Sequence, residues 1–388
     1  MTTRRYSNRE FEELKRWLDN NQDSVSEKIV NDFIEMVSKD YPAKRIIATN
    51  SCMGALHIAL QTIGVGPGDE VIVDPIVVFA GMAVMYQNAV PIFADIDSKT
   101  FNITPQSIRS RITPRTKAII CTHLFGNICN MEEILAIARE NNLPVIEDCA
   151  HALFSTRNGK YAGLFGDFSA FSFNHRKQLS TGQGGFLLIN SDDFTEKSKD
   201  KGFGRIPARL TWNYAMSGLI AGIAIAQWPY AKEYVRQDYQ LAQLYNQAVK
   251  DCAWLIPQKI PGENWPSYHI WSAIYKGDEY GIEYKELMKV LRENGGDYFL
   301  PSFMPYGAFS LTPSPVYRYP LFNEPRAYTK RCPTFCPHYE GKINYENDLC
   351  PNAEYLIPRL FNTVLSPVED DRVKRYADAL YKTIKYFS

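Results

Sequence analysis

The stretch KAIICTHLFGNICNMEEILAIARENNLPVIED, residues 117–148, decides how we interpret the fold. Lys117–His123 and Pro144–Asp148 are short apolar runs that predict buried strands. Between them, Asn130 followed three residues later by Glu133 predicts a helix N-cap, opening a helix through Asn142. A strand, a helix and a second strand at this spacing are typical of a parallel sheet.

The same alternation continues on both sides of this stretch. Further strands are predicted at 71–73, 90–96, 168–173 and 185–189, with helices at 79–88 and up to 112. The pattern predicts an α/β fold with a mostly parallel mixed sheet between helices. Ligands of such sheets bind beyond the carboxyl ends of the strands, where Asp148 ends one strand and Asn174–Lys177 follows another.

The rest of the chain has a different character. Residues 216–227 and 234–252 predict two helices, and beyond Ile256 the pattern is less regular, with clusters of Pro, Tyr and Phe. We predict an N-terminal helical segment at 1–24, a large α/β domain at 25–245 and a small C-terminal α+β domain at 246–388.

Composition excludes several classes of protein. The chain has 388 residues, 45% hydrophobic and 22% charged, which excludes a disordered or collagen-like chain. The 43 Lys+Arg balance 43 Asp+Glu, so binding to nucleic acid through bulk charge is not expected. The first residues lack the apolar run of a signal peptide, and no stretch is long enough to span a membrane. With eight cysteines interpreted as reduced thiols, we expect a cytoplasmic protein.

Four separated segments make sense together around a phosphorylated aromatic cofactor. Asn50–Leu56 runs directly into a helix, whose first amides favour a phosphate, although a simple capped helix fits as well. In Ile146–His151, Asp148 suits the protonated ring nitrogen of pyridoxal phosphate, although backbone amides could satisfy it instead.

The third segment, Phe171–Gly185, places Lys177 in a loop between two predicted strands. Glycines follow it, which suits an amine of lowered pKa and close backbone approach, whereas a surface lysine is the ordinary alternative. The fourth, Trp212–Ser217, is a polar turn before an apolar helix.

These segments, in this order, resemble the DegT/DnrJ/StrS family of pyridoxal phosphate-dependent sugar aminotransferases, which have the aspartate aminotransferase (fold type I) architecture. The resemblance covers residues 25–385. The segments that carry it are Asn50-Ser51 with Ala55-Leu56-His57, Gly68–Ile72 with Pro75 and Phe79, Thr113–Ile120, His123–Gly126, Glu147-Asp148 with His151, and Cys350-Pro351 with Ala353-Glu354.

The resemblance implies roles for particular residues. Lys177 would hold the cofactor covalently and move the proton, and Asp148 would keep the pyridine nitrogen protonated. The other cofactor contacts would come from Ser51, the amides of Cys52 and Met53, Phe79 stacked on the ring, His151 near the ring hydroxyl, Ser172 at the phosphate, and Asn213. Asn213 would reach the phosphate of the neighbouring subunit, which implies a homodimer with shared active sites.

Four positions depart from the family pattern. Cys52-Met53 stands where a Gly-Thr pair is usual, Gln183 where Glu is frequent, and Ala215 where the family has arginine. The first removes a threonine hydroxyl from the phosphate, and the last removes a contact to an acidic substrate. Relatives that replace the lysine by histidine are sugar 3-dehydratases, but here Lys177 is in register.

The family therefore implies transfer of an amino group from an amino acid donor such as glutamate to a keto-sugar, for a surface polysaccharide or similar glycan. Three alternatives stay open: an aminotransferase on a keto-sugar without a nucleotide, of the keto-deoxy-octulosonate or keto-inositol type, a deoxysugar dehydratase, and a non-catalytic sugar-binding homologue.

Other signals receive plainer interpretations. The spacing of Cys332, Cys336, His338 and Cys350 fits no standard zinc finger, so we expect no metal. Lys201, Arg205 and Arg209 fit a solvated loop better than a substrate phosphate site. The aromatic stretch Tyr298–Tyr339 is either a loop that determines substrate specificity or the packed core of the small domain.

Overall fold

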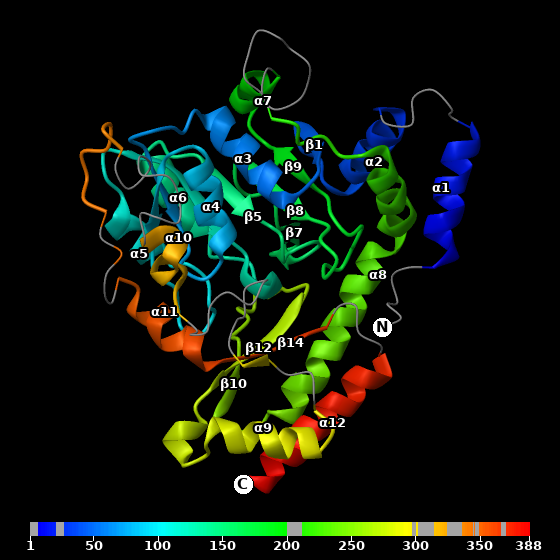
Figure 1. Cartoon of the computed structure of the whole chain (residues 1–388), viewed down its shortest axis with the longest axis vertical. Helices are drawn as coiled ribbons and strands as arrows, with labels where there is room; N and C mark the ends of the chain where they lie inside the picture. Colours follow the sequence, from blue (N-terminus) through cyan, green and yellow to red (C-terminus); the bar gives the residue numbers. More distant parts are fainter. Residues whose placement is uncertain are drawn as a thin grey trace.

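The computed structural model describes residues 7–20, 27–199, 212–296, 300–301, 314–323, 336–343, 345, 349–365 and 370–388 (Figure 1). Its helices are α1 Asn8–Asn20, α2 Glu27–Asp40, α3 Cys52–Ile63, α4 Val78–Tyr86, α5 Pro105–Arg111, α6 Met131–Glu140, α7 Asp192–Ser198, α8 Gly218–Ala248, α9 Tyr284–Glu293, α10 Pro320–Asn323, α11 Pro351–Leu356 and α12 Asp370–Tyr386.

A seven-stranded sheet forms the centre of the larger part. Its order is β1-β9-β8-β5-β4-β2-β3, and β9 alone among these strands runs antiparallel to the others. The strands are β1 Arg45–Thr49, β2 Glu70–Val73, β3 Val90–Phe93, β4 Thr116–Thr122, β5 Val145–Asp148, β8 Phe168–Ser172 and β9 Gly185–Ile189. This confirms the predicted α/β fold with a mostly parallel mixed sheet.

Helices cover both faces of the sheet because its central strands are apolar on both sides. On one face, Ile120 of β4 and Ile146 of β5 pack with buried residues of α3 and α4. On the other, Ile119 and Val145 pack with α2, α6 and the first half of α8. The carboxyl ends of the parallel strands are left between these layers as the edge available to a ligand.

A smaller part lies at the other end of the molecule, in the lower half of Figure 1. An antiparallel sheet of order β10-β12-β14-β13 packs there against α9, α12 and the end of α8. Its strands are β10 Leu255–Pro257, β12 Ile270–Tyr275, β13 Leu300–Pro301 and β14 Leu360–Val364. A third, small sheet contains β6 Thr156–Arg157, β7 Lys160–Tyr161 and β11 Asn264–Trp265.

The two helices predicted at 216–227 and 234–252 are wrong in one respect, because α8 is a single helix of 31 residues. Pro229 lies inside this helix with its side chain exposed, although proline lacks the N–H that would bond to the carbonyl four residues earlier. Trp228 and Ala231 on either side are buried, and this packing holds the helix together across the proline. The helix runs past residue 245, where we place the domain boundary, which remains a prediction.

Two further predictions concern membrane-spanning helices and the aromatic stretch 298–339. None of the helices in the described part of the chain is both long and apolar enough to cross a membrane. Within the aromatic stretch 298–339, Tyr317 and Phe322 are buried and pack on Phe93 of β3, with ring centroids 5.5 and 5.4 Å apart. These two rings belong to the core beside the large sheet. Most of the stretch lies outside the described residues.

Candidate active site

Eight of the nine predicted site residues line one cavity of about 370 Å³. It lies at the carboxyl edge of the large sheet, where Thr122, Asp148 and Ser172 end β4, β5 and β8. Its lining residues are Ser51, Cys52, Met53, Leu56, Val77, Val78, Phe79, Thr122, Asp148, Ala150, His151, Ser172, Asn174, His175, Lys177, Gln183 and Gly184. Sequence positions from 51 to 184 therefore meet in one place.

The N-terminus of α3 forms one wall of the cavity. Ser51 is the N-cap, and its Oγ accepts a hydrogen bond from the amide of Gly54 at 3.1 Å. The amides of Cys52 and Met53 belong to the first turn, where helical amides have no partner within the helix. Gly185 lies so close that a Cβ on it would come within 3.1 Å of the Cys52 nitrogen. This wall suits an anionic group such as a phosphate.

Asp148 occupies the end of β5 and is 1% exposed. Its Oδ1 accepts from the amide of Ala150 at 3.0 Å and lies 3.8 Å from the Cys52 thiol. Within the described ranges, no cationic side chain forms an ion pair with it, and burial raises the pKa of its carboxyl more than the Ala150 amide and Lys177 lower it. A buried carboxyl with a free acceptor position suits a cationic donor brought in by a ligand.

Lys177 lies in the loop between β8 and β9 and is 5% exposed. Its backbone amide donates to the carbonyl of Asn174 at 2.9 Å, and Asn174 itself forms a bridge to Gly182. Burial lowers the pKa of the amine to about 8, against the opposing effect of Asp148 and Cys52. The loop therefore holds an amine that is partly neutral near physiological pH, as a nucleophile or base requires.

His151 and His175 line the cavity, and a further histidine, His269, contacts Lys177 and His151 beside it. His151, a predicted site residue, accepts a hydrogen bond at Nδ1 from the amide of Phe125 at 3.3 Å. Burial and the nearby Lys177 hold the pKa of His151 well below its usual value, so the ring is neutral. Nε2 of His269 is 3.4 Å from Nζ of Lys177, and the ring centroid of His269 is 4.7 Å from that of His151.

Sequence reasoning missed His269 and Asn174. His269 comes directly before the buried strand β12, in the run Ser267-Tyr268-His269, and a polar run at the start of an apolar strand was the available signal. Asn174 lies three residues before Lys177 and lines the cavity, and its Oδ1 is buried without a hydrogen-bond partner. An orphaned polar atom facing a cavity is a mark of a ligand site.

Asn213 is the predicted site residue that does not line the cavity. It is exposed, and its carbonyl accepts from the side-chain amide of Asn50 at 3.3 Å. The amide of Asn50 donates to the carbonyl of Tyr214, and Thr49 forms a bridge to Ala215. The segment 213–215 is thus fixed beside the start of α3, with the Asn213 side chain in contact with solvent.

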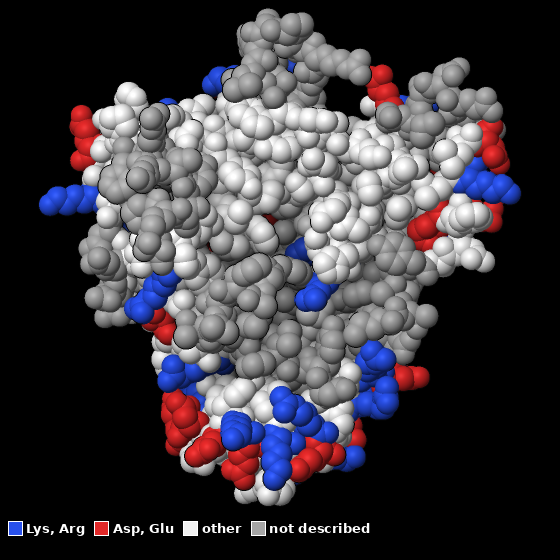
Figure 2. All heavy atoms as spheres, in the orientation of Figure 1, with Lys and Arg blue, Asp and Glu red and all other residues white. Residues whose placement is uncertain are grey.

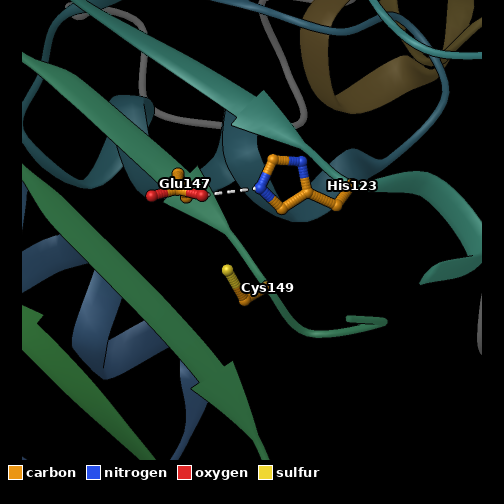
Figure 3. A group of neighbouring side chains, drawn as sticks. All are labelled: His123, Glu147 and Cys149. Atoms are coloured by element: carbon orange, nitrogen blue, oxygen red, sulfur yellow. Dashed lines mark hydrogen bonds and ion pairs between the residues drawn. The ribbon is translucent and has the colours of Figure 1, made fainter. Parts of the chain in front are cut away.

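Behind the cavity, His123, Glu147 and Cys149 form a buried group whose donor atoms lie within 4.8 Å of one another (Figure 3). Nε2 of His123 donates to Oε2 of Glu147 at 2.8 Å, and Nδ1 accepts from the amide of Cys129 at 3.2 Å. Both ring nitrogens are therefore already used. Glu147 also accepts from the amides of Gly163, Phe165 and Gly166 at 2.7–2.9 Å. Because the ring nitrogens of His123 and the oxygens of Glu147 already have hydrogen-bond partners, a structural network is favoured over a metal site.

The cysteines and histidine whose spacing fits no zinc finger lie only partly within the described residues. Cys332 lies outside the described residues, as do Lys201, Arg205 and Arg209 of the basic cluster. Cys350 is fully buried and starts α11. The prediction that the protein has no metal therefore remains a prediction.

The fold matches that of solved fold type I aminotransferases. The chain superposes over its full length on an aminotransferase from Psychrobacter cryohalolentis with a TM-score of 0.83, at 24% identity and over 99% of that chain. A second structure, NtdA from Bacillus subtilis with bound cofactor PMP, gives a TM-score of 0.76 at 23% identity, over 98% of this chain and 83% of that one.

Residues 5–320 match the DegT/DnrJ/EryC1/StrS aminotransferase family, and the chain belongs to it. This confirms the resemblance drawn from the sequence. GDP-perosamine synthase of Escherichia coli O157:H7 is 39% identical over 203 residues, which are 50% of this chain and 56% of that protein. The match thus spans little more than half the length of that relative. The spore coat polysaccharide biosynthesis protein SpsC of Bacillus subtilis is 28% identical over 88% of this chain and 86% of that protein.

Proposed function

We propose that the protein is a pyridoxal phosphate-dependent aminotransferase that transfers an amino group from an amino acid, glutamate in the first instance, to a keto-sugar. The observation that carries the proposal is that Lys177 and Asp148 are both buried on one cavity. Lys177 is an amine of lowered pKa, and Asp148 is a carboxyl that forms no ion pair with a cationic side chain of the described residues. Membership of a pyridoxal phosphate-dependent family supports it.

The residues of the cavity fit this cofactor. Ser51, Ser172 and the first-turn amides of Cys52 and Met53 would hold the phosphate, because a helix N-terminus favours a dianion. Asp148 would accept the hydrogen bond of the protonated ring nitrogen. Phe79 and His151, on the cavity lining, would contact the ring, and the orphaned Oδ1 of Asn174 offers a further polar contact.

When bound, the cofactor's protonated ring delocalises the negative charge that develops at the substrate carbon bearing nitrogen. The work of the chain is to position and to move protons. Asp148 keeps the ring nitrogen charged, since the buried carboxylate is stabilised by that cation. Lys177 would move a proton between the two carbons on either side of that nitrogen, as a general base and then as a general acid.

A sugar substrate is supported by the relatives, one a GDP-perosamine synthase and one a protein of spore coat polysaccharide biosynthesis. An amino sugar for a surface polysaccharide is the corresponding product. Ala215 in place of the family arginine favours an acceptor that needs no acid-binding arginine at that point. Lys177 in the catalytic position favours transamination over the dehydratase and non-catalytic alternatives.

The active unit would be a homodimer in which Asn213 reaches the phosphate bound to the neighbouring subunit. Asn213 is exposed beside the start of α3, as such a role requires. Nearby elements carry exposed apolar side chains, Tyr86 at the end of α4 and Leu219 at the start of α8. In Figure 2 the described part of the upper face carries few charged side chains, whereas charges of both signs gather at the lower end.

The experiment is to load the protein with pyridoxal phosphate, add glutamate with a panel of keto-sugars, and follow 2-oxoglutarate. The panel includes nucleotide-linked keto-hexoses, a keto-deoxy-octulosonate and a keto-inositol. Formation of 2-oxoglutarate that depends on one of these acceptors supports the proposal and identifies its acceptor. Loss of water from the sugar without 2-oxoglutarate would replace it by the dehydratase, and binding without turnover by the non-catalytic homologue.

A further inference from the structure

His269 is buried completely and has its Nε2 3.4 Å from Nζ of Lys177. One hydrogen bond joins these atoms, and its proton can be bonded to either nitrogen. In one form Lys177 is an ammonium and His269 a neutral acceptor, whereas in the other Lys177 is a neutral amine beside a histidine N–H. No role has been assigned above to this histidine, although it contacts the reacting atom.

The backbone around His269 is fixed against the large sheet. Ser267 donates from its hydroxyl to the carbonyl of His151 at 2.8 Å, and its carbonyl accepts from the side chain of Gln178, the residue after Lys177, at 3.2 Å. Gly126, at φ 98°, approaches so closely that a Cβ there would lie 2.6 Å from Oγ of Ser267. The loop that carries Lys177 and the loops after β4 and β5 therefore hold this segment in place.

Tyr268 has an unfavourable backbone conformation. Its φ of 47° lies in the left-handed region, which residues other than glycine, asparagine and aspartate adopt rarely. Strain of this kind persists only where the surroundings impose it, and it concentrates at functional sites. This strained conformation lies at the residue before His269. The turn of the backbone at Tyr268 directs the His269 side chain toward Lys177.

The other titratable groups around the pair come from four places in the fold. Asp148 at the end of β5 and Cys52 at the start of α3 face Lys177, and His151 faces both partners from the loop after β5. His175 lines the same cavity from the lysine's own loop. Burial and the nearby Lys177 lower the pKa of His151 and hold it neutral, and its Nδ1 accepts from the Phe125 amide. His269 is the one of these groups that shares a hydrogen bond with the amine.

We propose that His269 is a further catalytic residue, which takes a proton from the Lys177 ammonium and returns it, so that the amine is neutral when it attacks a carbonyl. The Nζ–H bond breaks and the Nε2–H bond forms, leaving a neutral amine and an imidazolium. No electrons are transferred, and the net charge of the pair is unchanged. The inference rests on the proposed function, because it concerns the same lysine.

The test measures how fast the cofactor-free protein takes up pyridoxal phosphate, followed by the visible absorbance of the lysine-bound cofactor between pH 6 and pH 10. Three proteins are compared: wild type, His269→Gln and His269→Phe. Gln keeps a hydrogen-bonding side chain but cannot take the proton, and Phe does neither. We expect both variants to lose about tenfold in rate at pH 7, because an amine with a pKa of about 8 is only about one-tenth neutral at that pH without a base. Both should approach the wild-type rate at pH 10, where the lysine needs no base.

Two results would overturn the inference. In the first, His269→Gln keeps the wild-type rate and pH profile, so that His269 only positions the lysine. In the second, both variants are impaired equally at every pH, so that the loss is structural. The exposed His338 provides the control, and His338→Gln should leave the profile unchanged. If wild type itself takes up no pyridoxal phosphate, the proposed function fails; if wild type is loaded and the variants behave like it, only the role of His269 fails.

Discussion

Glu147 and Asp148 are adjacent residues at the end of one strand, β5, and both are buried, yet their surroundings differ completely. Successive residues of a strand point to opposite faces of the sheet, so the two carboxyls occupy different environments. Glu147 accepts a hydrogen bond from His123 (Figure 3) and three more from backbone amides. Asp148 has one amide donor and faces the cavity.

The difference separates a structural acid from a chemical one. Burial alone would raise the pKa of both carboxyls. For Glu147, the hydrogen bonds from His123 and the amides outweigh burial and lower the pKa, whereas for Asp148 burial prevails and the pKa is raised. Polar groups saturated by the protein hold the fold together, and a group left unsaturated beside a cavity is available to a ligand.

The largest expected effect is on Lys177, which shares the cavity with Asp148. Lys177→Ala should lower the transamination rate by at least about 10³-fold, because the variant loses both the covalent link and the proton carrier. It should also lose the visible absorbance of the lysine-bound cofactor, while its thermal unfolding midpoint stays close to that of wild type. A variant with an unchanged spectrum would refute the assignment of Lys177.

The second prediction tests the two acids directly. Glu147→Gln should lower the free energy of unfolding by about 3–5 kcal/mol at pH 7, because it breaks a buried and hydrogen-bonded pair. Asp148→Asn should leave the stability of the cofactor-free protein unchanged or higher, yet lower the rate of transamination by about 10²-fold or more. Urea unfolding and initial rates measure the two effects. If Asp148→Asn were the less stable of the two variants, the assignment of Glu147 to stability and Asp148 to chemistry would be wrong.

The dependence on pH should have opposite signs for the two acids. The pKa of Glu147 is lowered from 4.5, so its contribution to stability is present above that pH and disappears as the pH falls through the folded-state value. The pKa of Asp148 is raised from 3.8, so its contribution is present below that pH and disappears as the pH rises through the folded-state value. Urea unfolding repeated near pH 3 should therefore show both differences from wild type diminished.

A smaller effect is expected at the phosphate wall. The double variant Cys52→Gly, Met53→Thr restores the family's usual pair and adds one hydroxyl donor. One hydrogen bond contributes about 0.5–1.5 kcal/mol, so the Kd for pyridoxal phosphate should fall by up to about tenfold. Titration of the cofactor-free protein measures it. Weaker binding by the double variant would show that the Cys52 thiol beside Asp148 contributes to the site.

The smallest expected effect concerns metal. Prolonged treatment with a chelator should leave the unfolding midpoint unchanged, because the ring nitrogens of His123 and the oxygens of Glu147 already have hydrogen-bond partners. Metal analysis of the untreated protein provides the companion measurement. One tight metal ion per chain, with a lower midpoint after its removal, would show that this network is a metal site.

Much of the fold was predictable because local patterns suffice for it. Apolar runs predicted the central strands, and the order of the motifs predicted the family. The continuity of α8 was not predictable, because an exposed proline reads as a break unless the packing of Trp228 and Ala231 on either side is known. Hydrophobic periodicity carries no information about such tertiary contacts.

The site was predictable where one residue had a recognisable neighbourhood in the chain. Asp148 ends one predicted strand and Lys177 follows another, and eight of the predicted residues share a cavity. His269 was not predictable, because it is 92 positions from Lys177 and reaches it through the backbone turn at Tyr268. The contrast between Glu147 and Asp148 was equally hidden, since the donors to Glu147 come from the loop 163–166.

The central claim is that this cavity holds pyridoxal phosphate on Lys177. It is tested most directly by incubating the protein with pyridoxal phosphate, reducing with borohydride and locating the modification by peptide mass spectrometry. We expect one phosphopyridoxyl group per chain, on the peptide that contains Lys177, and none when Lys177 is replaced by alanine. A modification spread over surface lysines, or none on that peptide, would contradict it.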